Sequence, residues 1–318
     1  MRRGCKTDMR ESEIIARFFD FAPGDRAPVG VGDDAAVLSP PPRTRLACCS
    51  DSLIEDVHFF ADADSFLLAR KAAAVSLSDI AATGARPLWM TVALAAKKNT
   101  EWFARFAEGL KSSAAEYGYA VVGGDLCRAE KVCITTTVLG ALDGPPLLRS
   151  GARAGDDAWI SGATGEAALA VHCRKTGRAA PPNYSDAINK KLNDPHPRLE
   201  LGCKLAKIAS AATDISDGLA ASARNVAARS GVRITLRMRD APIAPPLAAL
   251  PTPLRNELIL NGGDDYELFF CAPKSARNFL AKEKAFRIGE VSAGAGVEIV
   301  GADGEAICAR GYEHDFGE

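Results

Sequence analysis

Short clusters of glycine and aspartate recur along the whole chain and contain the residues best suited to chemistry. They are Gly32-Asp33-Asp34, Ser50-Asp51, Ser78-Asp79, Gly123-Gly124-Asp125, Asp214-Ile215-Ser216-Asp217-Gly218 and Gly262-Gly263-Asp264-Asp265. Most of these clusters follow or precede apolar runs. We therefore expect them at strand ends and helix starts, where folds present side chains to ligands.

The abundance of carboxylates predicts a metal-dependent enzyme. If the clusters converge, their carboxylates cannot be buried in the ionised form without counter-charges. Mg²⁺ prefers oxygen ligands and commonly joins a few carboxylates to substrate phosphates. The chain has no G-x-x-x-x-G-K-[ST] phosphate loop and no protein-kinase motif set, so a nucleotide must be held in another way. The residues favour a magnesium-dependent enzyme that acts on phosphorylated substrates.

Two of the aspartates stand out locally. Asp79 lies in an alanine-rich helix predicted over residues 65–83, and a charge in such a helix needs a metal ion or a hydrogen-bond donor. Asp51 is predicted to end a short strand over residues 46–49 and to begin a polar loop that contains His58. The structural alternatives are that Asp51 caps the next segment and that His58 is a solvated residue.

The other clusters have similar alternatives. Gly123-Gly124-Asp125 follows a predicted strand over residues 119–122, where its glycines admit a ligand close to the backbone or form a hairpin turn. Ser216 or Asp217 can cap the helix predicted to follow, and a helix N-terminus can bind an anion. Capping alone explains Ser216 but leaves the two neighbouring aspartates unexplained.

Composition restricts the class of protein. At 318 residues the chain suits two domains, and a net charge of −1 gives no sign of a nucleic-acid partner. No apolar run approaches the roughly 20 residues that span a bilayer. Nine cysteines occur without a CxxC pair, and the charged N-terminus lacks the apolar stretch of a signal peptide. We expect a cytoplasmic protein with reduced thiols and no membrane partner.

The pattern of apolar runs predicts an α/β (α+β) protein of two domains. A turn-rich segment, Asp143-Gly144-Pro145-Pro146, marks the break, and we place the domains at residues 1–148 and 149–318. Arg149 lies at this boundary, either as a plain linker charge or as a partner for phosphate. Further predicted elements are helices over residues 100–117 and 197–211, and strands over residues 35–38, 88–95, 132–142 and 306–309.

Seven motifs occur in a specific order and together resemble a known family. They are GDDAAVL, SDSLIEDVHF, KAAAVSLSDIAATGARP, VVGGD, RSGARAGD, TDISDGL and NGGDDYELFF. Over nearly the whole chain this series resembles the thiamine-monophosphate kinase family, within the aminoimidazole ribonucleotide synthetase-like superfamily. Two departures are visible: the family often has Glu at the position of Asp264, and the tail reads GYEHDF where GYDHF is usual.

The resemblance implies an activity and an assembly. It implies transfer of a phosphoryl group from ATP to thiamine monophosphate, giving thiamine diphosphate in the last step of its biosynthesis. It implies direct in-line transfer assisted by several Mg²⁺ ions. It also implies a homodimer in which N-terminal domains, each with a mixed sheet and helices, pair and bind ATP and Mg²⁺. The C-terminal domain, with its own mixed sheet, would complete the nucleotide and substrate site.

The resemblance also implies roles for individual residues. The positions that match metal ligands are Asp34, Cys49, Ser50, Asp51, Asp79, Asp125, Asp214 and Asp217, with Cys49 contributing through its backbone. The positions that match ATP contacts are Gly124, Asp125, Arg149 and Ser216. The positions that match thiamine monophosphate contacts are His58, Asp264 and Phe316. The catalytic set is Asp51, Asp79, Asp125 and Arg149.

Three alternatives stay open. A selenophosphate synthetase usually has a reactive Cys or selenocysteine in a glycine-rich N-terminal segment, a setting that Cys5 lacks. A hydrogenase-maturation relative would end in a reactive Cys, whereas this chain ends in Phe316-Gly317-Glu318. A non-catalytic, metal-stabilised binding protein would keep the aspartate clusters for structure and would not turn over ATP.

Overall fold

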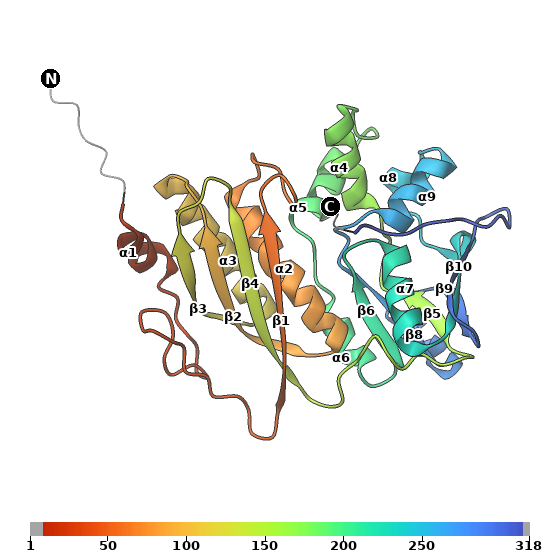
Figure 1. Ribbon diagram of the computed structural model, residues 1–318, viewed down its shortest axis with the longest axis horizontal. Helices are drawn as coiled ribbons and strands as arrows, with labels where there is room; N and C mark the ends of the chain where they lie inside the picture. The colour runs from red at the N-terminus through yellow and green to blue at the C-terminus, as the bar shows by residue number, and fades with distance from the viewer. Residues whose placement is uncertain (1–8, 314–318) are drawn as a thin grey trace, which may run out of the picture. The chain divides into compact units, whose positions relative to one another are not determined.

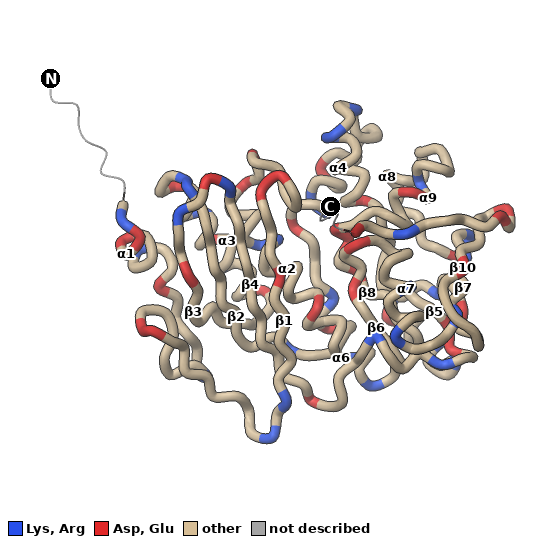
Figure 2. Tube along the Cα trace, in the orientation of Figure 1, with Lys and Arg blue, Asp and Glu red and all other residues tan. Residues whose placement is uncertain are grey.

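The computed structural model describes residues 9–313 and divides into two compact units, each built around one mixed β-sheet (Figure 1). The first unit comprises Met1–Ile80 and Pro87–Asp143, and the second comprises Ala81–Arg86 and Gly144–Glu318. The predicted α/β class is confirmed. Figure 2 shows acidic and basic residues interspersed along both units. Among the described residues, none of the helices has the length and apolar character needed to cross a membrane.

The first unit is a four-stranded sheet in the order β1-β4-β2-β3, with helices α2 and α3 on one face (Figure 1). Strands β1 and β4 pair antiparallel, whereas β2 and β3 pair parallel. The elements are α1 (Glu11–Ile14), the π-helix η1 (Ile15–Phe19), β1 (Arg45–Ile54), α2 (Ser65–Thr83), β2 (Arg86–Ala95), α3 (Thr100–Tyr117), β3 (Ala120–Cys127) and β4 (Cys133–Leu142).

The two long helices of this unit have clear start and stop signals. Asp64 Oδ1 accepts hydrogen bonds from the backbone N–H groups of Phe66 and Leu67 at 3.0 and 3.1 Å, which caps α2. Asn99 caps α3 in the same way, and Gly118 ends α3 in the left-handed conformation at φ 73°. The predicted cap of α3 was Thr100, which instead is the first helical residue.

Several predicted element ends in this unit are wrong. Strand β1 runs through Asp51 to Ile54, so Asp51 lies inside a strand rather than at its end. The Gly123-Gly124-Asp125 cluster also lies inside a strand, β3, and not after it. The strand predicted over residues 35–38 is reduced to one isolated bridge between Val29 and Val37.

The second unit is a six-stranded sheet in the order β10-β7-β9-β5-β8-β6. All its neighbouring pairs are antiparallel except β10 and β7. The elements are β5 (Asp157–Ile160), α4 (Glu166–Thr176), α5 (Ser185–Asn193), α6 (Leu199–Leu205), β6 (Ala211–Ile215), α7 (Leu219–Ser230), β7 (Arg233–Arg237), the 3₁₀ turn η2 (Met238–Asp240), α8 (Pro245–Ala248), α9 (Thr252–Asn261), β8 (Glu267–Ala272), the 3₁₀ turn η3 (Lys274–Ala276), α10 (Arg277–Lys282), β9 (Phe286–Ser292) and β10 (Gly296–Val300).

Strand β8 is at the centre of this core. All six of its residues are buried, as expected for a strand covered on both faces. Leu268 and Phe270 pack in one cluster with Leu205 of α6, Leu280 of α10 and Trp159 of β5. The loop that follows β6 and the loop that precedes β8 are therefore attached to strands with buried side chains.

The sequence-based elements of this unit need three corrections. The helix predicted over residues 197–211 ends at Leu205, and β6 begins at Ala211. Helices α5 and α8 were not predicted. The strand predicted over residues 306–309 is an isolated bridge between Val300 and Ala306.

Candidate functional site

Alternation along β1 directs Cys49 and Asp51 to the face of the sheet that α2 covers. Side chains two residues apart on a strand share a face, and the intervening Ser50 points to the opposite one. On that opposite face Ser50 Oγ lies 2.9 Å from Thr137 Oγ1 of β4. If Ser50 joins a site with Asp51, it therefore contributes through its backbone.

Ser76 of α2 orients both residues of β1. Its side chain is fully buried, and its hydroxyl donates to Asp51 Oδ2 at 2.9 Å. The thiol of Cys49 donates to the Ser76 backbone carbonyl at 3.2 Å. Ser76 Oγ also lies 2.7 Å from Thr136 Oγ1, a buried hydroxyl on β4. The positions of the carboxylate and the thiol are thus fixed by a hydrogen-bonded helix–strand contact.

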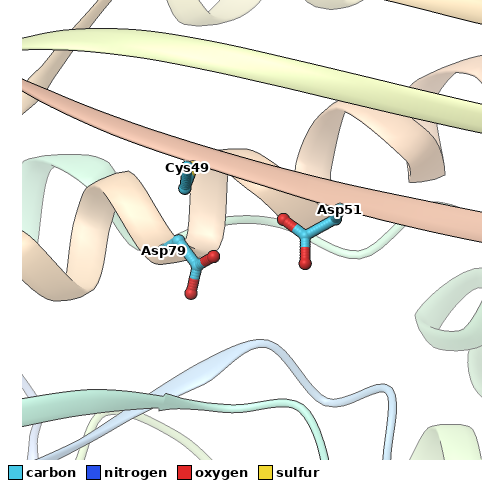
Figure 3. A group of neighbouring side chains, drawn as sticks. All are labelled: Cys49, Asp51 and Asp79. Atoms are coloured by element: carbon cyan, nitrogen blue, oxygen red, sulfur yellow. The ribbon is translucent and has the colours of Figure 1, made fainter.

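Asp79, one turn after Ser76 on α2, completes a compact group (Figure 3). One oxygen of Asp51, one oxygen of Asp79 and Cys49 Sγ all lie within 4.8 Å of one another, and all three residues are half-buried. Burial, followed by the charges of Asp79 and Asp51, raises the pKa of the Cys49 thiol. Two carboxylates at this separation repel each other, and a divalent cation between them relieves that repulsion. The donor set therefore fits a metal ion.

His58 lies in the turn that follows β1. Its Nδ1 accepts the backbone N–H of Ile54 at 3.0 Å, so in the neutral imidazole the proton is on Nε2. The His58 carbonyl accepts a hydrogen bond from Lys71 Nζ at 3.4 Å, and the Lys71 side chain is buried in α2. The turn thus holds His58 through both its Nδ1 and its backbone carbonyl.

Two other predicted residues of the first unit lie outside the Cys49–Asp51–Asp79 group. Asp34 is exposed in a turn, where its backbone N–H bonds Asp33 Oδ1 at 2.9 Å. Asp125 is exposed on β3, and β4 and β2 separate that strand from β1, which corresponds to three inter-strand spacings of about 4.8 Å each. Together with Gly123 and Gly124, Asp125 lines an otherwise apolar pocket, and Ile15 and Phe19 are also part of its lining.

Gly124 has a structural reason to be glycine. A Cβ at this position would lie 1.9 Å from the backbone oxygen of Val92 on the neighbouring strand. At Gly123 the nearest atom to an added Cβ is Thr91 Cγ2, at 3.9 Å. Close strand pairing therefore requires Gly124, and ligand approach is not needed to explain it.

In the second unit, the segments after β6 and before β8 are joined by backbone hydrogen bonds. The N–H of Asp264 donates to the Ser216 carbonyl, and the N–H of Tyr266 to the Ile215 carbonyl, both at 2.9 Å. Tyr266 Oη donates to Asp264 Oδ1 at 2.8 Å. Asp264 and Tyr266 both adopt positive φ angles, 67° and 53°. This pairing brings the predicted residues Ser216 and Asp264 to one place.

The aspartates around β6 differ in exposure. Asp214 is buried, and its carbonyl accepts Ser222 Oγ at 2.8 Å, whereas Asp217 is exposed. Helix α7 begins after Gly218 without a side-chain cap, so the predicted capping by Ser216 or Asp217 is wrong. The backbone N–H groups of its first turn have no cap from these side chains.

Arg149 is placed beside the same strand. Its Nε donates to Thr213 Oγ1 at 3.1 Å, and its carbonyl accepts Ser230 Oγ at 3.0 Å. Ser230 Oγ also accepts hydrogen bonds from the backbone N–H groups of Gly151 and Ala152, each at 3.1 Å. Arg149 is therefore anchored to Thr213 of β6 and to Ser230 of α7, and as a residue it is exposed. Phe316 lies outside the described residues.

Asp265 and Glu267, which follow Asp264, are both buried, and neither was assigned a role from the sequence. Both carboxylate oxygens of Asp265 accept the backbone N–H of Gly165 at 2.9 Å. Glu267, with a side chain only 2% exposed, bonds Arg198, Lys191 and Ser161. An acidic residue opening a fully apolar strand was the available signal, because such a charge needs a partner.

The chain has two mixed-sheet units, and acidic residues lie on β1 and α2 and in the loops beside β6 and β8. Comparison with known protein families gives the same division into two domains. Residues 32–142 match the N-terminal domain, and residues 153–302 the C-terminal domain, of AIR synthase related protein. The chain is therefore a two-domain protein of the AIR synthase-related class.

More specific relatives narrow the class. Thiamine-monophosphate kinase of Escherichia coli (strain K12) is 35% identical over 278 residues, covering 85% of each chain. The crystal structure of thiamine-monophosphate kinase from Stenotrophomonas maltophilia K279a, also 35% identical, has a TM-score of 0.82 and covers 93% of this chain and 96% of its own. AaThiL complexed with AMPPCP and TMP is 29% identical with a TM-score of 0.78, covering 86% and 88%. The chain belongs to the thiamine-monophosphate kinase family of enzymes.

Proposed function

We propose that this protein transfers the terminal phosphoryl group of ATP directly, in line, to the phosphate of thiamine monophosphate, giving thiamine diphosphate. The observation that carries the proposal is the convergence of Asp51 and Asp79 with Cys49, in a member of this kinase family. A related structure, AaThiL, contains both an ATP analogue, AMPPCP, and TMP.

The residues fit a magnesium-assisted reaction. Asp51 and Asp79 would hold Mg²⁺ through their carboxylate oxygens, with Asp34, Asp125, Asp214 and Asp217 as further proposed ligands. When bound, Mg²⁺ neutralises charge on phosphate oxygens. Ser76 keeps the Asp51 carboxylate in one orientation through its hydroxyl, so little reorganisation is needed at the reacting groups.

The other proposed roles follow from residue type and local geometry. Arg149 supplies a positive charge for the nucleotide phosphates, and its backbone is anchored by Ser230. His58 contacts thiamine monophosphate through its imidazole, as the family resemblance implies. The acceptor is already a phosphate anion, so the reaction requires no strong general base. Positioning of the substrates and neutralisation of charge account for the rate acceleration.

The direct test is formation of thiamine diphosphate by the purified protein from ATP and thiamine monophosphate, with and without Mg²⁺. Asp51→Asn and Asp79→Asn should each lower the turnover rate by roughly 100-fold or more, the scale seen when a charge-stabilising group is lost. Asp303→Asn, in an exposed turn of the second unit, is the matched control for loss of a carboxylate. ATP binding without any product would favour a non-catalytic binding protein. Near wild-type rates in both variants would instead contradict the assignment of Asp51 and Asp79 to the metal site.

We also propose that the working enzyme is a homodimer that pairs through its N-terminal sheets. The proposal rests on the family resemblance, with the strands predicted over residues 88–95 and 132–142 as the candidate pairing elements. Sedimentation at micromolar protein should give a dimer, and a fully active monomer would contradict the proposal.

A further inference from the structure

The third ligand atom of the Cys49–Asp51–Asp79 group is a sulfur. The family resemblance implies only a backbone contribution from Cys49, yet the side chain itself projects toward α2 and lies beside both carboxylates (Figure 3). A tetrahedral ion with metal–oxygen and metal–sulfur distances of about 2.0 and 2.3 Å holds its ligand atoms about 3.5 Å apart. The three atoms lie within 4.8 Å of one another, so no two of them need to approach by more than about 1.3 Å to bind one ion.

The chemistry of these three atoms discriminates between metals. Mg²⁺ is a hard ion that takes oxygen ligands, so it is not expected to coordinate the thiol. A thiolate with two carboxylates suits softer ions of the zinc type, and Co²⁺ and Zn²⁺ exceed Mn²⁺ in intrinsic affinity for such mixed sites. Three protein ligands with one open position is also the usual arrangement of a reactive zinc site.

We propose that Cys49 Sγ, Asp51 and Asp79 form a binding site for a thiophilic divalent cation, Zn²⁺, Co²⁺ or Cd²⁺, which competes with Mg²⁺. The competition rests on the proposed function, because the same two carboxylates hold Mg²⁺ there. Coordination replaces the S–H bond with a sulfur–metal bond and releases the proton to solvent. The expected consequence is inhibition of the kinase by traces of such ions.

The surrounding contacts hold two of the three ligand atoms in position. Ser76 fixes two of the three ligands, since its carbonyl accepts the Cys49 thiol and its hydroxyl donates to Asp51. Strand alternation places the neighbouring Cys48 on the other face of β1, where it is exposed. Cys48 is therefore a matched control: it has the same thiol group, but its side chain points away from Asp51 and Asp79.

The test uses the full chain, freed of metal by a chelator, and Co²⁺ alone as the probe. Binding to a thiolate produces a sulfur-to-cobalt charge-transfer absorption in the near ultraviolet, independent of enzyme activity. We expect one saturable band in the wild type and in Cys48→Ser, and its loss in Cys49→Ser. No band in the wild type, or an equal band in Cys49→Ser, overturns the site.

A second measurement separates this inference from the proposed function. Zn²⁺ should inhibit Mg²⁺-dependent formation of thiamine diphosphate, and Cys49→Ser should need at least about tenfold more Zn²⁺ for half-inhibition of its own rate. Equal sensitivity of the two proteins would refute the competition. A Cys49-dependent cobalt band in a protein that makes no thiamine diphosphate would support the metal site and refute the kinase proposal.

Discussion

Arg198 and Glu267 form a two-pronged ion pair in the second unit: Arg198 Nε donates to Glu267 Oε2 at 2.7 Å, and Nη2 donates to Oε1. Lys191 and Ser161 bond the same carboxylate. Burial opposes ionisation of Glu267, but hydrogen bonds and charge from Arg198 outweigh it and lower the pKa of Glu267. The pair connects the segment before α6 with the start of β8, two residues after Asp265.

Glu267→Gln should strongly destabilise the second unit. The substitution keeps the shape of the side chain but leaves the Arg198 and Lys191 charges without a buried partner, a loss of about 3–5 kcal/mol. Urea unfolding measures this loss. The control is Glu290→Gln, which breaks an exposed pair with Arg237 and should change stability by less than about 1 kcal/mol. Equal effects of the two variants would show that the buried pair has no special role.

Asp265 should make the folded protein less stable as the pH rises. Burial raises the pKa of Asp265 well above its ordinary value, although its hydrogen bond from Gly165 acts against the shift. A raised folded-state pKa contributes stability below the unfolded pKa of about 3.9, and that contribution is lost as pH rises through the folded pKa.

We therefore expect the wild type to lose stability relative to Asp265→Asn as pH rises, by up to about 1.4 kcal/mol per pH unit. The measurement is the unfolding free energy of both proteins from about pH 4 to about pH 8. Parallel curves would mean that the carboxyl group titrates normally.

The two adjacent glycines of β3 should respond differently to alanine. Gly124→Ala places a methyl group against the Val92 carbonyl oxygen, so we expect a loss of about 3 kcal/mol or more, or no soluble protein. Gly123→Ala meets only Thr91 Cγ2, at an ordinary van der Waals distance of 3.9 Å, and should stay within about 1 kcal/mol of the wild type. Thermal unfolding of the two variants is the measurement, and similar melting temperatures would contradict the strand-pairing explanation.

His58→Asn should separate the structural role of His58 from its binding role. The shorter amide can still accept the Ile54 N–H but cannot reach as far as Nε2. We expect an unchanged melting temperature and a KM for thiamine monophosphate raised by about tenfold, with little effect on the KM for ATP. An unchanged KM would remove His58 from the substrate site.

Phe316→Ala tests the predicted contact of the tail. An aromatic ring can stack on the flat, cationic thiazolium, so its loss should raise the KM for thiamine monophosphate more than that for ATP, by about tenfold for a contact of ~1.4 kcal/mol. Equal changes in the two KM values, or none, would show that the tail does not reach the pocket.

The sequence predicted some parts of this fold well and others poorly. Helix α2 has the predicted bounds, Ser65–Thr83, because a long alanine and leucine run with a cap has no competing structure. Residues 50–54 begin with three consecutive polar side chains, Ser50, Asp51 and Ser52, and were interpreted as a loop, whereas they continue β1. Their polar side chains Ser50 and Ser52 find hydroxyl partners on β4, and only the tertiary fold supplies those partners.

In the candidate site, too, local sequence patterns were predictable and contacts between distant segments were not. Asp51 and Asp79 were each recognisable from the apolar runs around them, but the strand–helix contact through Ser76 that joins them was not. Glu267 and Arg198 lie 69 positions apart, and no local pattern connects them. Pairings of this kind depend on packing between distant segments.

The loop that contains Asp264 and Tyr266 has a consequence for engineering this protein. Two non-glycine residues with positive φ store roughly 1–3 kcal/mol each, and the surrounding hydrogen bonds hold the loop in this conformation. Substitution of Asp264 by asparagine, which tolerates positive φ and keeps an oxygen acceptor, is therefore a route to higher thermal stability, whereas Tyr266 is buried and its removal would leave a cavity. Because Asp264 is a proposed substrate contact, selection for heat resistance alone should drive changes here that trade turnover for stability.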